Sequence, residues 1–480
     1  MFVKHFIFTL SIVFLVAACT PAAPIANPIS TDLVSPTGAA GETPAPPVIS
    51  EQTATPEPSR TPRPTATPVS LLLEKIEELP DACADFVQGL PGEGLGEVAY
   101  LPSGLCFHGE LDVFEIDGHD YVAQVFQNRF PNSKAAFRIV DVTDAEQPFM
   151  VSAWGWNIPT YSADIKAFRQ GDRWFLALSR DPSFTNDTLC SLVGGVAIIE
   201  VTEPTKPTLM GVLAGESTGS RAQWCNSHTA EVSRDADGNG VYLYVSATDI
   251  FDLRVLDIRD LKHVSEVGHY THPDAGFYNE RNFFYVHDTT IVGDRVYVAH
   301  WSAGLIILDR QALEAGKLVA PLNPLDSIDP WGLQVHHAYP TMDEQFVFIE
   351  DESFSDLPKS HLRLYDIRDL QFPKEVGAIM LADPLGTPHN LLVVGDRLFV
   401  GWYQDGVRVF RYDTSDPDHP SIEPYAFKAV RTRTTSNPVA GDYDGIWGVR
   451  VHECVVAGQP TTCVFASDIT YGLIVLAIEP

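Results

Sequence analysis

The sequence predicts an all-β fold: a seven-bladed β-propeller of four-stranded antiparallel blades, preceded by a disordered linker. Two observations predict the propeller. A short apolar strand recurs seven times, five times with an acidic residue near its end, and a hairpin lies upstream of each copy. Four antiparallel strands at a long fixed period are typical of a propeller blade. The linker is predicted by the abundance of Pro and Thr before residue 70.

The composition excludes one class of function. The chain has 480 residues, with 63 Asp and Glu against 32 Lys and Arg, and its formal net charge is −31. Non-specific nucleic-acid binding needs a basic face, so we expect no nucleic-acid partner. Hydrophobic residues make up 45% of the chain, which is enough to build a packed core.

The first 18 residues predict export. Lys4 gives a positive start, and an apolar run of about eleven residues follows, which suits a signal peptide and is too short to span a bilayer. The run ends in Leu-Val-Ala-Ala-Cys, which resembles the bacterial lipobox. The resemblance implies a lipid on Cys19 and a membrane partner, with the protein facing the cell exterior or the periplasm. The alternative is an ordinary secretory signal with a chance cysteine.

The segment after the signal peptide is expected to be a stalk. Residues 19–70 include the Pro/Thr-rich stretches Thr53–Pro58 and Thr61–Pro68. Such sequences favour polyproline II and act as semi-rigid spacers. We expect a short helix and loop as a lead-in over residues 71–96 and the propeller over residues 97–480.

The seven cysteines suit an exported protein. Once Cys19 is assigned to the lipid, six remain, and an even number outside the cytoplasm suggests disulfides. The simplest pairing is Cys83–Cys106, Cys190–Cys225 and Cys454–Cys463, the last across a predicted hairpin turn, although six cysteines allow fifteen pairings. No Cys-x-x-Cys occurs, which argues against a thiolate zinc site.

One strand pattern defines the repeat. Residues 137–142 read FRIVDV and residues 253–258 read LRVLDI. Related strands lie at 196–201, 305–309, 362–367, 407–412 and 473–478. The last copy stops after its third strand, so we expect residues 97–101 to supply the fourth strand and close the ring. A closed ring leaves no sheet edge exposed.

These copies resemble the LVIVD repeat, a propeller repeat common in exported bacterial proteins. Residues 137–144 and 253–260 carry the resemblance, which extends over about residues 110–480. It implies a propeller fold but no particular activity, because most members of the family have no assigned activity. Arg411 and Ala477 replace the acidic residue of the pattern in the last two copies.

Five histidines share one repeat position, at the start of the first strand of a hairpin. They are His228, His287, His337, His389 and His452. Because the first strand of each blade lines the channel of a propeller, we expect these rings around one mouth of that channel. Imidazole binds zinc, iron, copper and nickel, so the set is a candidate transition-metal site. The architectural alternative is that each ring bonds to the backbone of the next blade.

Aromatic residues lie a few positions before these histidines. They are Trp224, Phe283, Trp331 and Trp447, and Trp156 is similarly placed in the second blade. An aromatic rim of this kind could stack on a sugar or an apolar ligand. Packing between adjacent blades is the alternative.

A short acidic segment is a candidate calcium loop. Asp235, Asp237 and Asn239 match its first half, although Ser246 stands where a bidentate Glu is expected. A hairpin turn rich in Asp, Asn and Gly explains the same residues.

Three functions remain open from the sequence. The first is a lipid-anchored binding or scaffold module whose ligand is a surface protein or a glycan. The second is a metal-dependent enzyme with a His-ligated centre at the mouth of the channel, and the third is a calcium-stabilised adhesin. No nucleophile elbow, phosphate loop, dinucleotide fingerprint or zinc-protease motif occurs, so no catalytic residue is assigned.

Overall fold

The part of the chain that the structure describes begins after the linker. The computed structural model describes residues 71–79, 89–105, 107–127, 134–182, 192, 194–275, 284–325, 327–328, 334–353, 362–431 and 443–479. The chain divides into two compact units, Met1–Ala66 and Thr67–Pro480, and all described residues belong to the second. The expected signal peptide, linker and lipidated Cys19 therefore lie outside the described residues.

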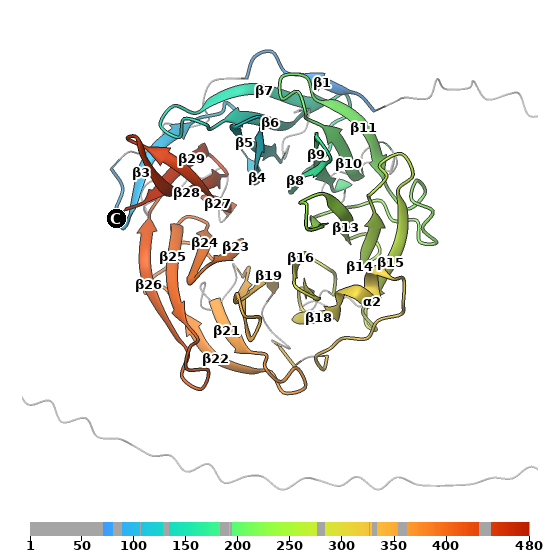
Figure 1. Cartoon of the computed structure of the whole chain (residues 1–480), viewed down its shortest axis with the longest axis vertical. Helices are drawn as coiled ribbons and strands as arrows, with labels where there is room; N and C mark the ends of the chain where they lie inside the picture. Colours follow the sequence, from blue (N-terminus) through green and yellow to red (C-terminus); the bar gives the residue numbers. More distant parts are fainter. Residues whose placement is uncertain are drawn as a thin grey trace, which may run out of the picture. The chain divides into compact units, whose positions relative to one another are not determined.

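The second unit is a ring of seven antiparallel sheets around one axis (Figure 1). Blade 1 contains β4 (His108–Ile116), β5 (His119–Phe126), β6 (Ala135–Asp141) and β7 (Phe149–Trp156). Blade 2 contains β8 (Ile165–Gln170), β9 (Arg173–Arg180), β10 (Gly195–Glu200) and β11 (Thr208–Leu213). Blade 3 contains β12 (Ala230–Arg234), β13 (Gly240–Ala247), β14 (Asp252–Asp257) and β15 (Ser265–Thr271).

The other four blades complete the ring. Blade 4 contains β16 (Asp288–Val292), β17 (Arg295–Ala299) and β18 (Leu305–Asp309). Blade 5 contains β19 (Val335–Pro340), β20 (Phe346–Asp351), β21 (Leu362–Asp366) and β22 (Lys374–Ile379). Blade 6 contains β23 (Leu391–Val394), β24 (Arg397–Trp402), β25 (Gly406–Asp413) and β26 (Ser421–Lys428). Blade 7 contains β27 (Ile446–Val456), β28 (Gln459–Asp468), β29 (Gly472–Ile478) and β3 (Leu95–Leu101). The prediction of a seven-bladed, all-β propeller is confirmed.

Blade 7 combines a strand that precedes blade 1 in the sequence with three strands from the C-terminal part of the chain. Strand β3 pairs antiparallel with β29, with Ala99 opposite Val475, and Figure 1 shows the blue strand beside the red one. The prediction that residues 97–101 supply the last strand is confirmed. The pairing covers the edge of β29 that would otherwise expose unpaired backbone groups.

Blade 4 differs from the expected four-stranded pattern. In the described residues it has three strands, and β18 is followed by α2 (Arg310–Glu314), whose first turn is capped by Asp309 Oδ1 accepting from Ala312 N at 2.7 Å. The backbone N–H of Leu322 donates to Ile307 O at 2.8 Å. The side chain of Asn323 accepts from Ile307 N and donates to Leu305 O. These hydrogen bonds pair backbone groups at the edge of β18, where a fourth strand was expected.

The lead-in to the propeller is also different from the expected helix. Residues Leu73–Lys75 form β1, which pairs with the outer edge of β7. Residues Gly92–Glu93 form β2, which pairs with β26. Residues 71–79 therefore form no helix, because the open edge of an outermost strand offers them backbone partners. The rest of the predicted helix and loop, residues 80–88, lies outside the described residues.

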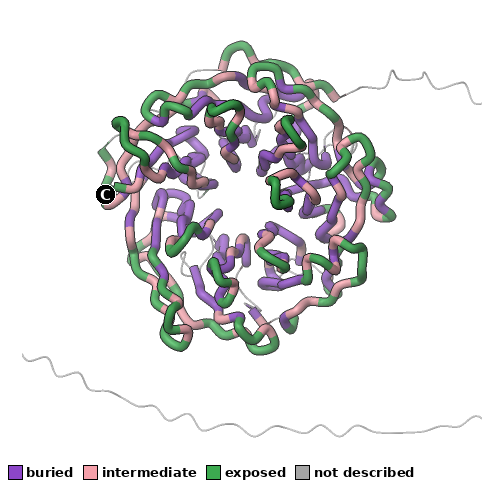
Figure 2. Tube along the Cα trace, viewed as in Figure 1, coloured by how far each residue is buried: buried purple, intermediate pink, exposed green. Residues whose placement is uncertain are grey.

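The hydrophobic core lies between neighbouring blades. Phe137 and Ile139 of β6, for example, share one cluster with Ala197 and Ile199 of β10. Figure 2 shows this pattern as buried strands near the axis and exposed turns at the periphery. The turn between β23 and β24 has Gly395 at φ +61°, a conformation that favours glycine.

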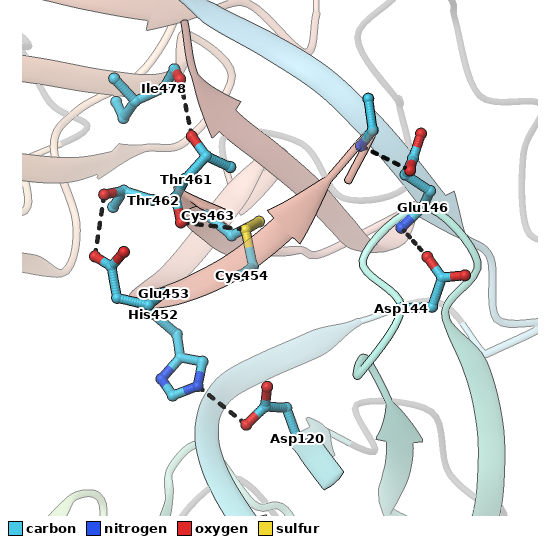
Figure 3. The surroundings of a disulfide bond; sticks show 11 residues. Asp120, Asp144, Glu146, His452, Glu453, Cys454, Thr461, Thr462, Cys463 and Ile478 are labelled. Atoms are coloured by element: carbon cyan, nitrogen blue, oxygen red, sulfur yellow. Dashed lines mark hydrogen bonds and ion pairs between the residues drawn. A yellow bond between two sulfur atoms is a disulfide. The ribbon is translucent and has the colours of Figure 1, made fainter. Parts of the chain in front are cut away.

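One of the disulfides predicted from the sequence is present in the structure. A disulfide joins Cys454 on β27 to Cys463 on β28 (Figure 3), so this predicted pair is confirmed. Cys225 is also disulfide-bonded, while Cys83, Cys106 and Cys190 lie outside the described residues. Among the helices of the described segments, none is long and apolar enough to cross a membrane.

Candidate metal centre

Four histidine rings stand side by side near the axis, one from each of blades 3 to 6. They belong to His228, His287, His336 and His389, and all four are buried. The ring centroids are 4.6 Å apart between His228 and His287, 4.1 Å between His287 and His336, and 4.0 Å between His336 and His389. The row continues into blade 7, where Trp447 lies 4.3 Å from His389. The first strands of four successive blades thus bring four imidazoles into one cluster.

Carboxylates hold two of these rings by the Nδ1 atom. Nδ1 of His228 lies 3.2 Å from Oδ2 of Asp181, and Nδ1 of His336 lies 2.6 Å from Oε1 of Glu350. A metal-binding histidine usually donates its second ring N–H to a carboxylate or a backbone carbonyl, which fixes the ring and leaves the other nitrogen for the ion. In both rings that other nitrogen is Nε2.

A backbone carbonyl holds the third ring. Nδ1 of His389 lies 2.6 Å from the carbonyl oxygen of Trp447. Because a carbonyl can only accept, Nδ1 carries the proton and Nε2 carries the lone pair. His287 lacks support of this kind: its buried Nδ1 has no hydrogen-bond partner among the described residues, and its ring instead bonds to the backbone of His336.

Glu352 adds an oxygen ligand to this cluster. Its Oε2 lies 3.9 Å from Nε2 of His336, and its Oε1 accepts a hydrogen bond of 2.5 Å from the hydroxyl of Tyr403. Ligand atoms of His287, His336 and Glu352 all lie within 4.8 Å of one another. Two donors at about 2.0–2.1 Å from one ion are at most about 4 Å apart, so small side-chain shifts would bring the three together.

The cavity beside the cluster lacks a positive side chain. It leaves about 10 Å³ for the centre of a water-sized species, which is room for a single ion or water. Its lining contains the four histidines, Trp447 and the acids Glu110, Asp164 and Asp288, with no Lys or Arg.

Burial favours the neutral form of two of the four histidine rings. It lowers the pKa values of His287 and His336 well below the usual range, and the neighbouring histidines lower them further. Neutral imidazole is the form that binds metal. Burial also raises the pKa of Glu350 well above its usual range and that of Asp288 to about 7. A bound cation would favour the ionised carboxylates instead.

Two aromatic residues that the sequence did not single out cover the rings. Trp301 stacks on His287 with centroids 4.8 Å apart, and the ring of Tyr403 lies 4.8 Å from His389. Both residues have positive φ angles, 50° and 28°, which is uncommon for a bulky side chain and is found most often at functional sites.

His337, predicted as a ligand, points away from the cluster and its neighbour His336 takes the place. Nε2 of His337 lies 3.1 Å from Thr290 Oγ1, and its Nδ1 accepts from Leu391 N. A β-bulge between Val335 and His337 adds one residue to this strand. A one-residue shift in a strand turns a side chain to the opposite face.

His452 also lies apart from the other four histidines. It belongs to β27, and its Nε2 lies 3.0 Å from Oδ1 of Asp120, close to the disulfide (Figure 3). It does not line the cavity, and Trp447 occupies the corresponding place in blade 7. Of the five predicted rings, the structure therefore brings together His228, His287 and His389.

The predicted aromatic rim is divided between different surroundings. Trp156 and Trp224 are buried in the hydrophobic clusters between blades, while Trp447 lines the histidine cavity. Phe283 and Trp331 lie outside the described residues. Binding of a surface protein or glycan stays a prediction.

The candidate calcium residues form the turn between β12 and β13. Oδ1 of Asp235 accepts from the backbone N–H groups of Asp237 and Asn239. The Arg169 guanidinium donates to the carbonyl of Asp237. The carboxylate that would lead a calcium loop is thus engaged within the turn, and calcium binding stays a prediction.

Fold and site together define a seven-bladed propeller with a buried histidine centre on its axis. The model of the LVIVD repeat matches residues 285–309, which run from the approach to β16 through β18, so the predicted repeat is confirmed there. No curated protein is similar in sequence to this chain.

Solved structures offer only weak similarity. The chain is similar to an ancestral GH74 enzyme with a TM-score of 0.49 at 10% identity, covering 79% of this chain and 49% of that one. It thus spans about half the length of that enzyme. It is also similar to the periplasmic gluconolactonase of Pseudomonas aeruginosa, with a TM-score of 0.44 at 14% identity, covering 72% and 92% of the two chains.

Proposed function

We propose that this protein is a metal-dependent enzyme whose centre is one transition-metal ion on the propeller axis. His287, His336 and Glu352 are the first ligands, and His228 and His389 complete the set. The proposal rests on the hydrogen bonds that fix the rings. In three of the four rings Nδ1 is bound, to Asp181, Glu350 or the Trp447 carbonyl. This support directs Nε2 of each ring to the ion.

The contacts favour a ligand role over the architectural alternative. That alternative requires each ring to bond to the backbone of the next blade, and two of the four rings do so: His389 bonds to Trp447 and His287 to His336. His228 and His336 bind carboxylates instead. A cavity lined by imidazoles and carboxylates, with no positive side chain, is matched to a cation.

The donor set indicates the class of metal. Imidazole nitrogen with one carboxylate oxygen suits iron, zinc, copper or nickel rather than calcium or magnesium, which prefer oxygen alone. When bound, such an ion supplies Lewis-acid or redox chemistry. The chain's own residues hold the ion, keep the rings neutral and exclude bulk water.

A metal analysis with neighbouring variants tests the proposal. Protein purified without a His-tag should contain about one equivalent of a transition metal or bind one equivalent of Co²⁺. His336→Ala should lose this ion, whereas His337→Ala, one residue away and facing Thr290, should keep it. Circular dichroism checks that both variants fold. Equal metal content in the two variants, or none in the wild-type chain, would refute the metal centre.

We also propose that the protein is exported and lipid-anchored. The Cys454–Cys463 disulfide supports an oxidising compartment, and the lipobox-like segment before Cys19 supports the anchor. Mass spectrometry of the N-terminal peptide should find an acylated Cys19, and Cys19→Ser should release the protein from membranes. An unmodified mature N-terminus elsewhere would contradict the anchor and leave the metal centre unaffected.

A further inference from the structure

A second, larger cavity lies directly against the histidine cavity. It has a volume of about 390 Å³ and is lined by residues from the first strands of all seven blades. Glu110, Asp288 and Asn390 line both cavities, so the two adjoin at these residues. We call the larger cavity the axial channel.

Carboxylates outnumber cations in the part of the axial channel next to the histidines. Nζ of Lys166 lies 2.6 Å from Asp164 and 3.9 Å from Glu231. In the same way, Arg450 lies 3.3 Å from Glu110 and 3.2 Å from Asp112. Each cation is therefore matched by two carboxylates.

Asp288 adds a fifth carboxylate to this inner belt. Its Oδ1 accepts a 2.6 Å hydrogen bond from Thr289 N, and no Lys or Arg of the described residues pairs with it. The remaining cations of the lining are Arg234 and Arg310, and Arg234 lies 4.0 Å from Glu231 of this belt. Arg234 donates to Ala167 O, and Arg310 pairs with Glu314. The belt thus has five carboxylates, Asp288 included, against the three cations Lys166, Arg234 and Arg450.

A buried acceptor without a partner lies at the junction of the two cavities. The side chain of Asn390 is more than nine-tenths buried and donates through Nδ2 to Glu110, yet its Oδ1 has no hydrogen-bond partner. A buried acceptor left unsatisfied destabilises a fold by about 1–3 kcal/mol. A cation or a water held at this point would satisfy it.

We propose that the axial channel is the path by which the metal cation reaches the histidines, and that Asp288 and Asn390 Oδ1 bind it on the way. This inference rests on the proposed metal centre. A narrow channel with low-dielectric walls and one sign of excess charge raises the local concentration of the matching ion and its association rate. Oxygen atoms bind such an ion less tightly than the imidazoles beyond them, so it passes inward.

Loading kinetics test the path separately from the centre. Co²⁺ is mixed with the metal-free full-length chain, and its absorbance is followed with time. Glu231 lines the channel but not the histidine cavity, so Glu231→Gln should slow loading about three- to tenfold at low salt. Glu231→Lys should slow it further, and both should still bind one equivalent at equilibrium. The difference should shrink when the salt is raised, because salt screens such attraction.

The matched controls are Glu423→Gln and Glu423→Lys, on the exposed face of the outermost strand β26. They carry the same charge changes and should load like the wild type. If the Glu231 variants load at the wild-type rate, the path is wrong while the centre stands. If the wild-type chain binds no Co²⁺ at equilibrium, both proposals fall.

Discussion

Nδ1 of His336 lies 2.6 Å from Oε1 of Glu350, and both side chains are almost completely inaccessible to solvent. The two residues come from neighbouring strands of blade 5, β19 and β20. A carboxylate behind an imidazole orients the ring and makes its other nitrogen a stronger donor. This pairing is therefore what a metal-binding Nε2 of His336 requires, whereas packing alone does not require it.

Replacing Glu350 with Gln should weaken metal binding without removing it. The amide keeps the shape and can still accept a hydrogen bond, but it lacks the negative charge, and loss of such a partner typically costs 10–100-fold in affinity. Competition titration with Co²⁺ measures the change. Glu375→Gln, on the exposed outer strand of the same blade, is the control. Equal affinities in the two variants would remove the proposed role of Glu350.

The sequence predicts the ring well because the evidence for it is local. The repeated strands and the hairpins upstream of them lie within single blades, and the strand that closes the ring follows from the missing fourth strand of the last copy. The Cys454–Cys463 pair was also predictable, because it spans one hairpin. Blade 4 was not, since the cover of its edge by Asn323 is particular to that blade.

The centre was predicted only in part, because its geometry depends on details that vary between blades. The repeat position at the start of the first strand selected His337, but the β-bulge after Val335 moves His336 into the cluster. In blade 7 the same repeat position selected His452, since the hairpin of β27 and β28 is unusually long.

Three further residues around the histidines were missed for another reason. Asp181, Glu352 and Tyr403 each follow the second strand of their blade. This shared position was a usable signal. Their partners, however, come from strands far away in the chain or across a hairpin, and single-sequence patterns do not reveal such contacts.

Arg431 should be one of the most important residues for stability. Its guanidinium is completely buried and binds Asp444 and Asp468 at 2.7 and 2.9 Å. Arg431→Met removes the buried cation that binds both buried carboxylates, and breaking a buried pair in this way costs about 3–5 kcal/mol. Urea unfolding should show this loss. Arg411→Met removes an exposed pair with Asp396 and should cost less than about 1 kcal/mol, so similar losses would contradict the prediction.

The disulfide of blade 7 should contribute a moderate part of the stability. It closes a short loop, with a sequence separation of 9 residues, and a loop of that size corresponds to about 2–3 kcal/mol from restriction of the unfolded chain. The double variant Cys454→Ser/Cys463→Ala should lose this amount in urea unfolding under non-reducing conditions and should still bind Co²⁺. Loss of metal binding in a folded variant would show that this hairpin matters to the centre.

His300 should be a residue whose removal stabilises the protein, and more so in acid. It is fully buried between β17 and β18, and neither ring nitrogen has a hydrogen-bond partner among the described residues. His300→Phe keeps an aromatic ring and removes two unsatisfied polar atoms, a change that can be neutral or stabilising.

The pH dependence makes this prediction specific. Burial, helped by the nearby His272, lowers the pKa of His300 from 6.5 to about 3. Between these values the unfolded chain binds a proton that the folded chain does not, so His300 lowers the free energy of unfolding as the pH falls. The advantage of His300→Phe should therefore grow by about 2 kcal/mol between pH 7 and pH 5. Urea unfolding at both pH values measures it, with His269→Phe, exposed on β15, as the control. An advantage that is the same at both pH values would show that His300 takes up its proton without unfolding.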